Sequence, residues 1–391
     1  MADSCDVVIV GGGVMGLSLA LHLAALGVND VVLIEKRFCG AGSSGKSGAI
    51  CRQHYSNEVT AALARDSLAW YAALEHDLFR TTGCLFFADA ALGGTMALNV
   101  RLLQSLGIRT EMIDVRRARE IEPRLLLDDA PAICWEPDAG YCDAPGVIAH
   151  LAGLVRAAGV DIRLGHRVAT LERSAGAVRG VRLEDGATLR AEVVVNAANA
   201  WAAPLARTVD IDLPIRATRP EIAFSLRPRV DHRQSPTHPV MADLTNAFYA
   251  RPDLPGQTLM GGLDIECDPE VPDPDREPEG IADETVCELN RRIARRIPEM
   301  QRSRSRGGMG ALYACTPDHH ALIGEEPSCR GLFTCAGFSG HGFKLAPEIG
   351  RELAHRITRG TWDRHDLSIY RPTRFAEDQP VQGRYDYSIL G

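Results

Sequence analysis

The sequence predicts an α/β fold in which a doubly wound, parallel-sheet domain is interleaved with a second domain built on an antiparallel sheet. The first thirty-five residues have the pattern of strand, glycine-rich turn, helix and strand, which is the building unit of a doubly wound sheet. Residues 213–304 contain short apolar runs broken by Pro and Gly, which is typical of antiparallel strands. No repeat and no low-complexity linker separates these patterns, so we expect the two domains to alternate along the chain.

The opening unit carries a specific motif. The segment 6–10 is a short apolar strand, 11–16 contains G-x-G-x-x-G, and Leu17–Leu26 is an Ala/Leu-rich helix. A second apolar strand, Val31–Glu35, ends in an acid nineteen residues after the last glycine. A glycine motif in this full context predicts a dinucleotide site.

Each part of the motif has a physical role. Gly11 makes the tight turn, Gly13 lets the backbone approach a pyrophosphate, and Gly16 lets the helix pack closely on the strands. The helix N-terminus offers N–H groups and a positive dipole to phosphates. Glu35 can accept hydrogen bonds from ribose hydroxyls.

Composition excludes several other classes. A signal peptide would open with positive charge, whereas this chain opens with Asp3 and Asp6, and a membrane span would not begin with three glycines. The net charge of −8 leaves no electrostatic footprint for nucleic acid, and the run 291–306 is interpreted as a solvated helix face. The eleven cysteines include no C-x-x-C, which favours reduced thiols, a cytoplasmic location and no metal site.

The remaining elements follow from hydrophobic period and turn residues. Helices are predicted over 58–74, 95–106, 116–122, 145–158, 283–297 and 347–356. Strands are predicted over 83–87, 161–163, 167–169, 178–183, 188–191 and 191–195, with strand-rich stretches at 214–226, 241–264, 307–324 and 331–338. The small-residue run 40–48 is either a flexible surface loop or backbone that lies against a bound cofactor, and its place after the motif favours the cofactor.

Four stretches together resemble one family: 8–35, 43–55, 193–201, and Thr316–Asp318 with Gly337–Lys344. They are similar to the FAD-dependent amino acid and amine oxidoreductases of the D-amino acid oxidase type, in the branch of sarcosine oxidase, glycine oxidase and dimethylglycine dehydrogenase. The likeness spans the chain and is weakest over 80–135 and 215–300.

The resemblance implies FAD rather than NAD, held in a Rossmann-like FAD-binding domain made of residues 1–80, 136–212 and 305–391. Residues 81–135 and 213–304 would form the antiparallel-sheet, substrate-binding domain. The cofactor-binding residues that the resemblance implies are Gly11, Gly13, Val14, Met15, Gly16, Glu35, Lys36, Ser43, Ser44, Val168, Ala198, Gly340, Gly342, Phe343 and Lys344.

The implied chemistry moves a hydride from a substrate α-carbon to flavin N5 and needs a cation for the substrate carboxylate. Resemblance to sarcosine oxidase suggests Arg52 and Lys344 for this role, since Arg offers a planar fork and Lys a point charge. His341 would add positive potential near the reduced ring, and Tyr313 and Tyr55 would form an aromatic wall. The competing interpretations are a surface ion pair for Arg52, a structural histidine, and ordinary core tyrosines.

Three departures from the family pattern refine this prediction. Ala311 stands where covalently flavinylated relatives carry a cysteine, so we expect non-covalent FAD. Met260 aligns loosely with a lysine that helps oxygen react, which favours a dehydrogenase. Gly45 and Ala49 replace a His and an Arg, which suggests room for a larger amine substituent.

The leading hypothesis is FAD-dependent oxidation of the C–N bond of a small amino acid or secondary amine, first of all an N-substituted glycine. The imine product would hydrolyse to glyoxylate and an amine, and O2 would reoxidise the flavin to give H2O2. One alternative is a dehydrogenase or heteromeric β-type subunit that acts on proline or dimethylglycine with another acceptor. A second is a flavin-binding subunit without catalysis. No nucleic-acid or membrane partner is expected, and the choice between a homo-oligomer and a heteromeric partner stays open.

Overall fold

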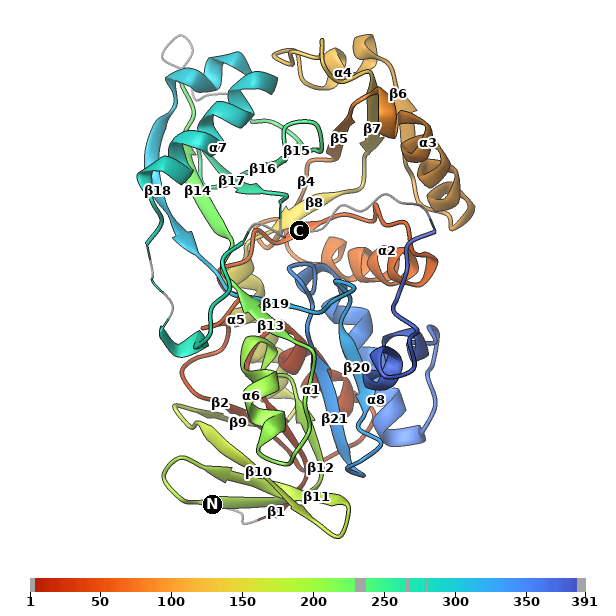
Figure 1. Ribbon diagram of the computed structural model, residues 1–391, viewed down its shortest axis with the longest axis vertical. Helices are drawn as coiled ribbons and strands as arrows, with labels where there is room; N and C mark the ends of the chain where they lie inside the picture. The colour runs from red at the N-terminus through yellow and green to blue at the C-terminus, as the bar shows by residue number, and fades with distance from the viewer. Residues whose placement is uncertain (1–3, 229–236, 265–267, 277, 279, 385–391) are drawn as a thin grey trace.

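The computed structural model describes residues 4–228, 237–264, 268–276, 278 and 280–384. Two eight-stranded sheets carry the fold, one in the lower half and one in the upper half of Figure 1. Two smaller sheets lie between them: β3 (Ile50–Cys51), β8 (Gly140–Cys142) and β4 (Phe79–Thr81) form one, and β13 (Arg216–Thr218) and β19 (Tyr313–Cys315) form the other. Among the described residues, no helix combines the length and apolar character that a membrane crossing needs.

The first sheet has a parallel centre in the order β9-β2-β1-β12-β21. Its strands are β1 (Ser4–Val10), β2 (Val31–Glu35), β9 (Asp161–Leu164), β12 (Thr188–Asn196) and β21 (Leu332–Ala336). Antiparallel strands β10 (Val168–Ser174), β11 (Ala177–Leu183) and β20 (Leu322–Glu325) extend it. The predicted doubly wound unit is confirmed, because β1 and β2 pair in parallel on either side of the first helix.

One prediction about this sheet is wrong. Residues 188–191 and 191–195 were expected to be two strands, but they form the single strand β12. Its first half pairs with β11 and its last three residues pair with β21. No turn residue interrupts 188–196, so the backbone stays extended while its neighbour changes.

Helix α1 (Val14–Ala25) begins three residues earlier than predicted. Gly13 is its extended N-cap, so the last three residues of the glycine motif already form the first helical turn. Gly16 sits where a Cβ would lie 2.0 Å from the carbonyl oxygen of Gly11, and only a glycine permits this approach of helix to strand.

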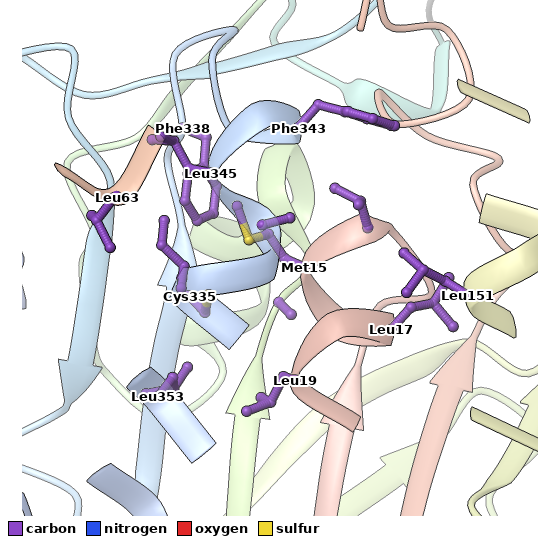
Figure 2. Close-up of a cluster of buried hydrophobic side chains, with 14 of the residues drawn as sticks. Met15, Leu17, Leu19, Leu63, Leu151, Cys335, Phe338, Phe343, Leu345 and Leu353 are labelled. Atoms are coloured by element: carbon purple, nitrogen blue, oxygen red, sulfur yellow. The ribbon is translucent and has the colours of Figure 1, made fainter. Parts of the chain in front are cut away.

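The helices α1, α5 (Ala144–Ala157), α2 (Glu58–Ala72) and α8 (Ala346–Arg359) build the core beside the first sheet, and the short α6 (Ala202–Arg207) packs with the second hydrophobic cluster of this half. Figure 2 shows Met15, Leu17 and Leu19 of α1 among side chains from the C-terminal part of the chain. Leu17 and Leu353 are fully buried, and each contributes roughly 1.5–3 kcal/mol of transfer free energy. This packing joins the motif at the start of the chain to its far end.

The second sheet has the strand order β18-β14-β17-β16-β15-β5-β7-β6. Its strands are β5 (Cys84–Ala88), β6 (Glu111–Ile113), β7 (Ala132–Glu136), β14 (Glu221–Leu226), β15 (Val240–Asp243), β16 (Phe248–Pro252), β17 (Gln257–Gly262) and β18 (Arg304–Gly310). All neighbours are antiparallel except β15 and β5, which pair in parallel. Two distant segments of the chain, 84–136 and 221–310, therefore contribute strands to one sheet. The predicted domain boundaries stay a prediction.

Three helices accompany the second sheet: α3 (Ala90–Ser105), α4 (Val115–Ile121) and α7 (Asp283–Arg296). The interpretation of residues 291–306 as a solvated helix face is wrong at Arg296, whose side chain is fully buried. Its guanidinium lies 2.8 Å from the Asp243 carboxylate and 4.8 Å from the centre of the Phe87 ring. The sequence of an arginine-rich run does not indicate which arginine is buried. Here Arg296 is buried because it pairs with the buried Asp243 of β15.

Candidate active site

A cavity of about 640 Å³ lies between the two large sheets. It opens at the carboxyl ends of β1, β2 and β12, where doubly wound sheets bind their ligands. On its other side it reaches Ile222 of β14 and Tyr249 of β16 in the second sheet. The cavity therefore connects a nucleotide-type sheet with a second sheet that can present a substrate.

The glycine turn forms one wall of this cavity. Gly11 has φ +119°, and its N–H donates to the carbonyl of Ile34 at 2.9 Å. Gly11, Gly13, Val14 and Met15, four of the predicted cofactor-binding residues, line the cavity. Gly16 is not among the lining residues, because its role is the close packing of α1 against the turn.

Glu35 ends β2 at the edge of the cavity. Its two carboxylate oxygens accept the N–H groups of Gly12 at 2.8 Å and Arg37 at 2.9 Å. These bonds hold the carboxylate in place while lone pairs stay available to a ribose.

The loop 40–48 is packed against the cavity, which is lined by residues 41–44 and 46–48. The N–H of Gly40 donates to the carbonyl of Gly12 at 2.9 Å. Ser44 accepts the N–H of Val14 at 3.0 Å, and Ser43 donates to the carbonyl of Leu312 at 2.5 Å. This loop is therefore built into the cavity wall, as the cofactor interpretation predicted.

The end of the cavity near Glu35 also gathers Lys36, Val168, Ala198 and Trp201. The ammonium of Lys36 lies 3.5 Å from the centre of the Trp201 ring, which is a close cation–π contact. Lys36, Val168 and Ala198 are predicted cofactor residues, whereas Trp201 is the last residue of the stretch 193–201 that carries the resemblance.

The opposite end is formed by the segment 337–344 and by aromatic side chains. Gly340, Gly342, Phe343 and Lys344 line it, and Lys344 is only 4% exposed. Burial lowers the pKa of Lys344 well below its usual value, and the positive charge of Arg52 lowers it further. When it is protonated, the buried ammonium attracts an anionic group of a ligand.

The remaining predicted catalytic residues separate into two groups. Tyr313 lines the cavity together with Tyr249, which sequence reasoning missed, and these two side chains share a hydrogen bond. Burial raises the pKa of Tyr249 to about 12 and that of Tyr313 well above its usual value, so both phenols are neutral. Alternation along the strand 248–252 would have pointed to Tyr249 once its register was known.

Arg52, Tyr55 and His341 are not among the residues that line the cavity and form a buried cluster behind its wall. Arg52 donates to the carbonyl of His54 at 2.7 Å, and its guanidinium lies 4.8 Å from the centre of the Tyr55 ring. The rings of Tyr55 and His341 are 5.7 Å apart. Arg52 therefore acts on a ligand in the cavity indirectly, because its positive charge lowers the pKa of Lys344.

His341 is a poor source of positive charge. Burial lowers its pKa well below 6.5, and the neighbouring charges of His320 and Lys344 lower it further. Its Nε2 lies 2.8 Å from the carbonyl oxygen of His319, which identifies the nitrogen that carries the proton of the neutral ring. The cluster therefore contributes charge through Arg52 and shape through its rings.

The alignment of Met260 with an oxygen-activating lysine over the flavin is wrong in this structure. Met260 is fully buried in the cluster that includes Ile293 of α7, on the face of the second sheet that points away from the cavity. Its neighbour Leu259 packs in the same cluster as Ile222 and Tyr249, which line the cavity. Successive residues of a strand face opposite sides, so a shift of one residue moves a side chain from one face to the other.

All three lysines of the chain, Lys36, Lys46 and Lys344, line the cavity. Each of them comes from a segment outside the second sheet. The second sheet therefore carries none of the chain's lysines, although the resemblance implies one there. Met260 is not the residue that takes its place, because it lies on the other face of the sheet.

One group of potential metal ligands occurs in the described part of the chain: Asp66, Glu348 and His365. Both acids already pair with arginines, Asp66 with Arg65 at 2.7 Å and Glu348 with Arg351 at 3.0 Å. Two cations beside the carboxylates disfavour a third. The prediction that the chain has no metal site stays a prediction.

The residues present fit a flavin dinucleotide. The glycine turn, the helix N-terminus and Glu35 suit the two phosphates and the ribose, and the cavity continues from them to Lys344 and the two tyrosines. A nucleotide site whose cavity continues to a second sheet and to the buried Lys344 is typical of a flavin-dependent oxidoreductase.

The chain belongs to the DAO family of FAD-dependent oxidoreductases, whose family model matches residues 6–356. The predicted resemblance and the FAD cofactor are thereby confirmed. The 4-methylaminobutanoate oxidase (formaldehyde-forming) of Paenarthrobacter nicotinovorans is 28% identical over an alignment of 364 residues that covers 90% of this chain and 44% of that protein. The monomeric sarcosine oxidase of Bacillus sp. (strain NS-129) is 24% identical, with 96% of this chain and 98% of that protein covered.

The same relationship is visible in three dimensions. The L-proline dehydrogenase from P. horikoshii superposes with a TM-score of 0.88 at 25% identity, covering 97% of this chain and 100% of that one. The chain spans less than half the length of several curated relatives that it matches.

Proposed function

We propose that the protein oxidises the C–N bond of a small amino acid or secondary amine, first of all an N-substituted glycine, to an imine that hydrolyses to glyoxylate and an amine. FAD, when bound, supplies the two-electron acceptor for this reaction. The observation that carries the proposal is Lys344, a buried lysine at the end of the FAD cavity, close enough to Arg52 to feel its positive charge. An anionic group held there fixes the position of the neighbouring α-carbon.

The side chains around Lys344 would orient the substrate and exclude water. Tyr249 and Tyr313 form an aromatic wall, and their neutral phenols place no charge beside a substrate amine. Of the two small residues on which the prediction of a larger amine substituent rests, Ala49 lines the cavity and Gly45 does not. The small side chain of Ala49 supports an amine substituent larger than methyl. The substrate amine must be neutral before its C–H bond is cleaved, and bulk water or the flavin site takes up its proton.

The proposal has two versions, which differ in the electron acceptor that reoxidises the flavin. Reoxidation by O2 would give H2O2, as in an oxidase. A dehydrogenase, or a heteromeric subunit acting on proline or dimethylglycine, is favoured by the lack of any lysine on the second sheet. The name of the L-proline dehydrogenase among the similar structures supports the same alternative.

The proposal is tested by anaerobic bleaching of the bound flavin with a panel of N-alkylglycines, D-amino acids and proline. Bleaching by an N-alkylglycine supports the leading proposal, and bleaching by proline alone supports the alternative. A flavin that no amine reduces would favour a flavin-binding subunit without catalysis. Peroxide formation in air, compared with reduction of an artificial acceptor, then separates oxidase from dehydrogenase.

Replacement of Arg52 by Met is expected to weaken carboxylate binding less than loss of Lys344 itself, because Arg52 is not in the cavity wall. Its positive charge is also one cause of the lowered pKa of Lys344, so that pKa should rise in the variant. The binding of acetate, measured by flavin absorbance as a function of pH, should therefore persist to higher pH. Arg52→Lys keeps the charge and serves as the control; identical profiles for all three proteins would remove Arg52 from the site.

We expect FAD to be released when the protein is denatured with acid, because Ala311 replaces the cysteine of covalent relatives. Among the described cysteines, Cys335 lines the cavity, and burial raises its pKa to about 12, so it stays an unreactive thiol. Flavin absorbance should appear entirely in the supernatant after precipitation. Flavin that stays with the pellet would contradict non-covalent binding. The cytoplasmic location stays a prediction, and the choice between a homo-oligomer and a heteromeric partner stays open.

A further inference from the structure

An arm of the chain, residues 269–276, extends from the second-sheet half of the molecule to the nucleotide end of the cavity. Two backbone hydrogen bonds anchor its start: the N–H of Arg219 donates to the carbonyl of Pro269 at 3.0 Å, and the N–H of Val271 donates to Ala217 at 2.8 Å. Its end is the short helix η3 (Pro274–Arg276), which lies in the teal segment that descends beside the first sheet in Figure 1.

The carboxylate of Asp275 binds three groups of the first-sheet half. Its Oδ1 accepts from the ammonium of Lys36 at 2.6 Å and from the indole N–H of Trp201 at 3.0 Å. Its Oδ2 accepts from the guanidinium of Arg167. These donors follow β2, precede β10 and follow β12, so one side chain of the arm ties together three segments that converge at the nucleotide end.

The position of this contact is as informative as its strength. Asp275, Lys36, Arg167 and Trp201 all line the cavity, beside Glu35 at the end of β2. Pro274 of the arm lines it as well. The arm is thus part of the wall around the region that fits the adenosine half of FAD, although it belongs to a segment that sequence patterns assign to the other domain.

We propose that Asp275 is a latch that retains FAD, by holding the arm across the adenosine end of the cavity. The cofactor leaves only after the carboxylate has separated from Lys36, Arg167 and Trp201. The latch acts on the dinucleotide and does not depend on which amine is oxidised.

The latch is electrostatic and partly open to solvent, which gives it a measurable signature. The side chains of Lys36, Asp275 and Arg167 are 23%, 33% and 39% exposed. Ions screen such contacts, so salt should loosen the latch and speed cofactor release. Without the latch, the rate of FAD release would lack this dependence on salt.

The test measures FAD dissociation by the rise of flavin fluorescence after dilution far below the concentration at which FAD rebinds. Asp275→Asn and Asp275→Ala should each speed release by about tenfold, as expected for loss of several charge-assisted hydrogen bonds. Arg276→Gln is the matched control, since this neighbour is 87% exposed and pairs with Asp273 of the arm itself. The control should release FAD at the wild-type rate.

Release that is equally fast in wild type and both Asp275 variants would overturn the proposal. The salt dependence provides a second measurement that needs no folded variant: wild-type release should accelerate as KCl is raised from low to molar concentration, and an unchanged rate would also overturn it. Neither readout uses turnover. If no amine bleaches the flavin but the Asp275 variants release FAD faster, only the proposed reaction is refuted. If an amine bleaches the flavin but the variants release FAD at the wild-type rate, only the latch is refuted.

Discussion

Replacement of Lys344 by Met is expected to weaken binding of the substrate carboxylate by about 10- to 150-fold, which corresponds to the roughly 1.5–3 kcal/mol of a charge-assisted hydrogen bond. The unbranched Met side chain has a similar length, so the buried position keeps its packing. The measurement is the substrate concentration that half-saturates anaerobic flavin reduction, with FAD content determined by absorbance. Wild-type saturation in the variant would remove Lys344 from the site.

The pH dependence of Lys344 gives the same prediction an independent readout. Burial and the charge of Arg52 lower its pKa well below the usual lysine value, so its positive charge is present at low pH and is lost as pH rises through the lowered pKa. Acetate carries no titrating amine, and its affinity should therefore fall with rising pH in the wild type. Lys344→Arg keeps its charge and should bind acetate independently of pH, whereas Lys344→Met should bind weakly throughout.

The nucleotide end of the cavity could be predicted from sequence because its parts are close in the chain. The turn at Gly11, the N-cap at Gly13 and the acid Glu35 belong to one βαβ unit, in which chain connectivity alone brings them together. Local patterns are sufficient there, and the only error was the start of α1, which the glycine run concealed.

The substrate end could be predicted only through resemblance, and the directions of its side chains depend on the fold. Which face a strand residue occupies depends on register, so the alignment that places Met260 at the cavity is wrong, and Tyr249 and Leu259 occupy that side of the sheet. Arg52 is not among the residues that line the cavity, and its contact with the substrate stays a prediction. Composition and spacing do not encode the direction of either side chain.

Contacts between distant segments left no pattern in the sequence at all. Asp275 meets Lys36 across 239 positions, and nothing about an acid in a Pro-rich stretch indicates such a partner. Arg296 is a similar case, because its buried acid Asp243 lies 53 positions away. These contacts join the halves of the molecule, or a helix to its sheet, and they appear only when the topology is known.

The contact between Arg296 and Asp243 leads to the largest expected change in stability. Asp243 accepts from Nε of Arg296 at 2.9 Å and from the N–H of Asn246 at 3.0 Å, and both charged side chains are fully buried. Arg296 also donates to the carbonyl of Leu126 at 2.8 Å and to Asp129 at 2.7 Å. This network fastens the end of α7 to the second sheet.

Asp243→Ala should lower the free energy of unfolding by about 3–5 kcal/mol, because it leaves the buried guanidinium with one exposed acid as its remaining charged partner. Urea unfolding, followed by far-UV circular dichroism, should show an earlier transition. The matched control is Arg291→Ala, which removes a 70% exposed arginine of the same helix and should change stability by less than about 0.5 kcal/mol. The double variant Asp243→Leu with Arg296→Met replaces both charges by apolar groups and should recover part of the loss. A wild-type transition in Asp243→Ala would mean that the buried pair does not hold α7 in place.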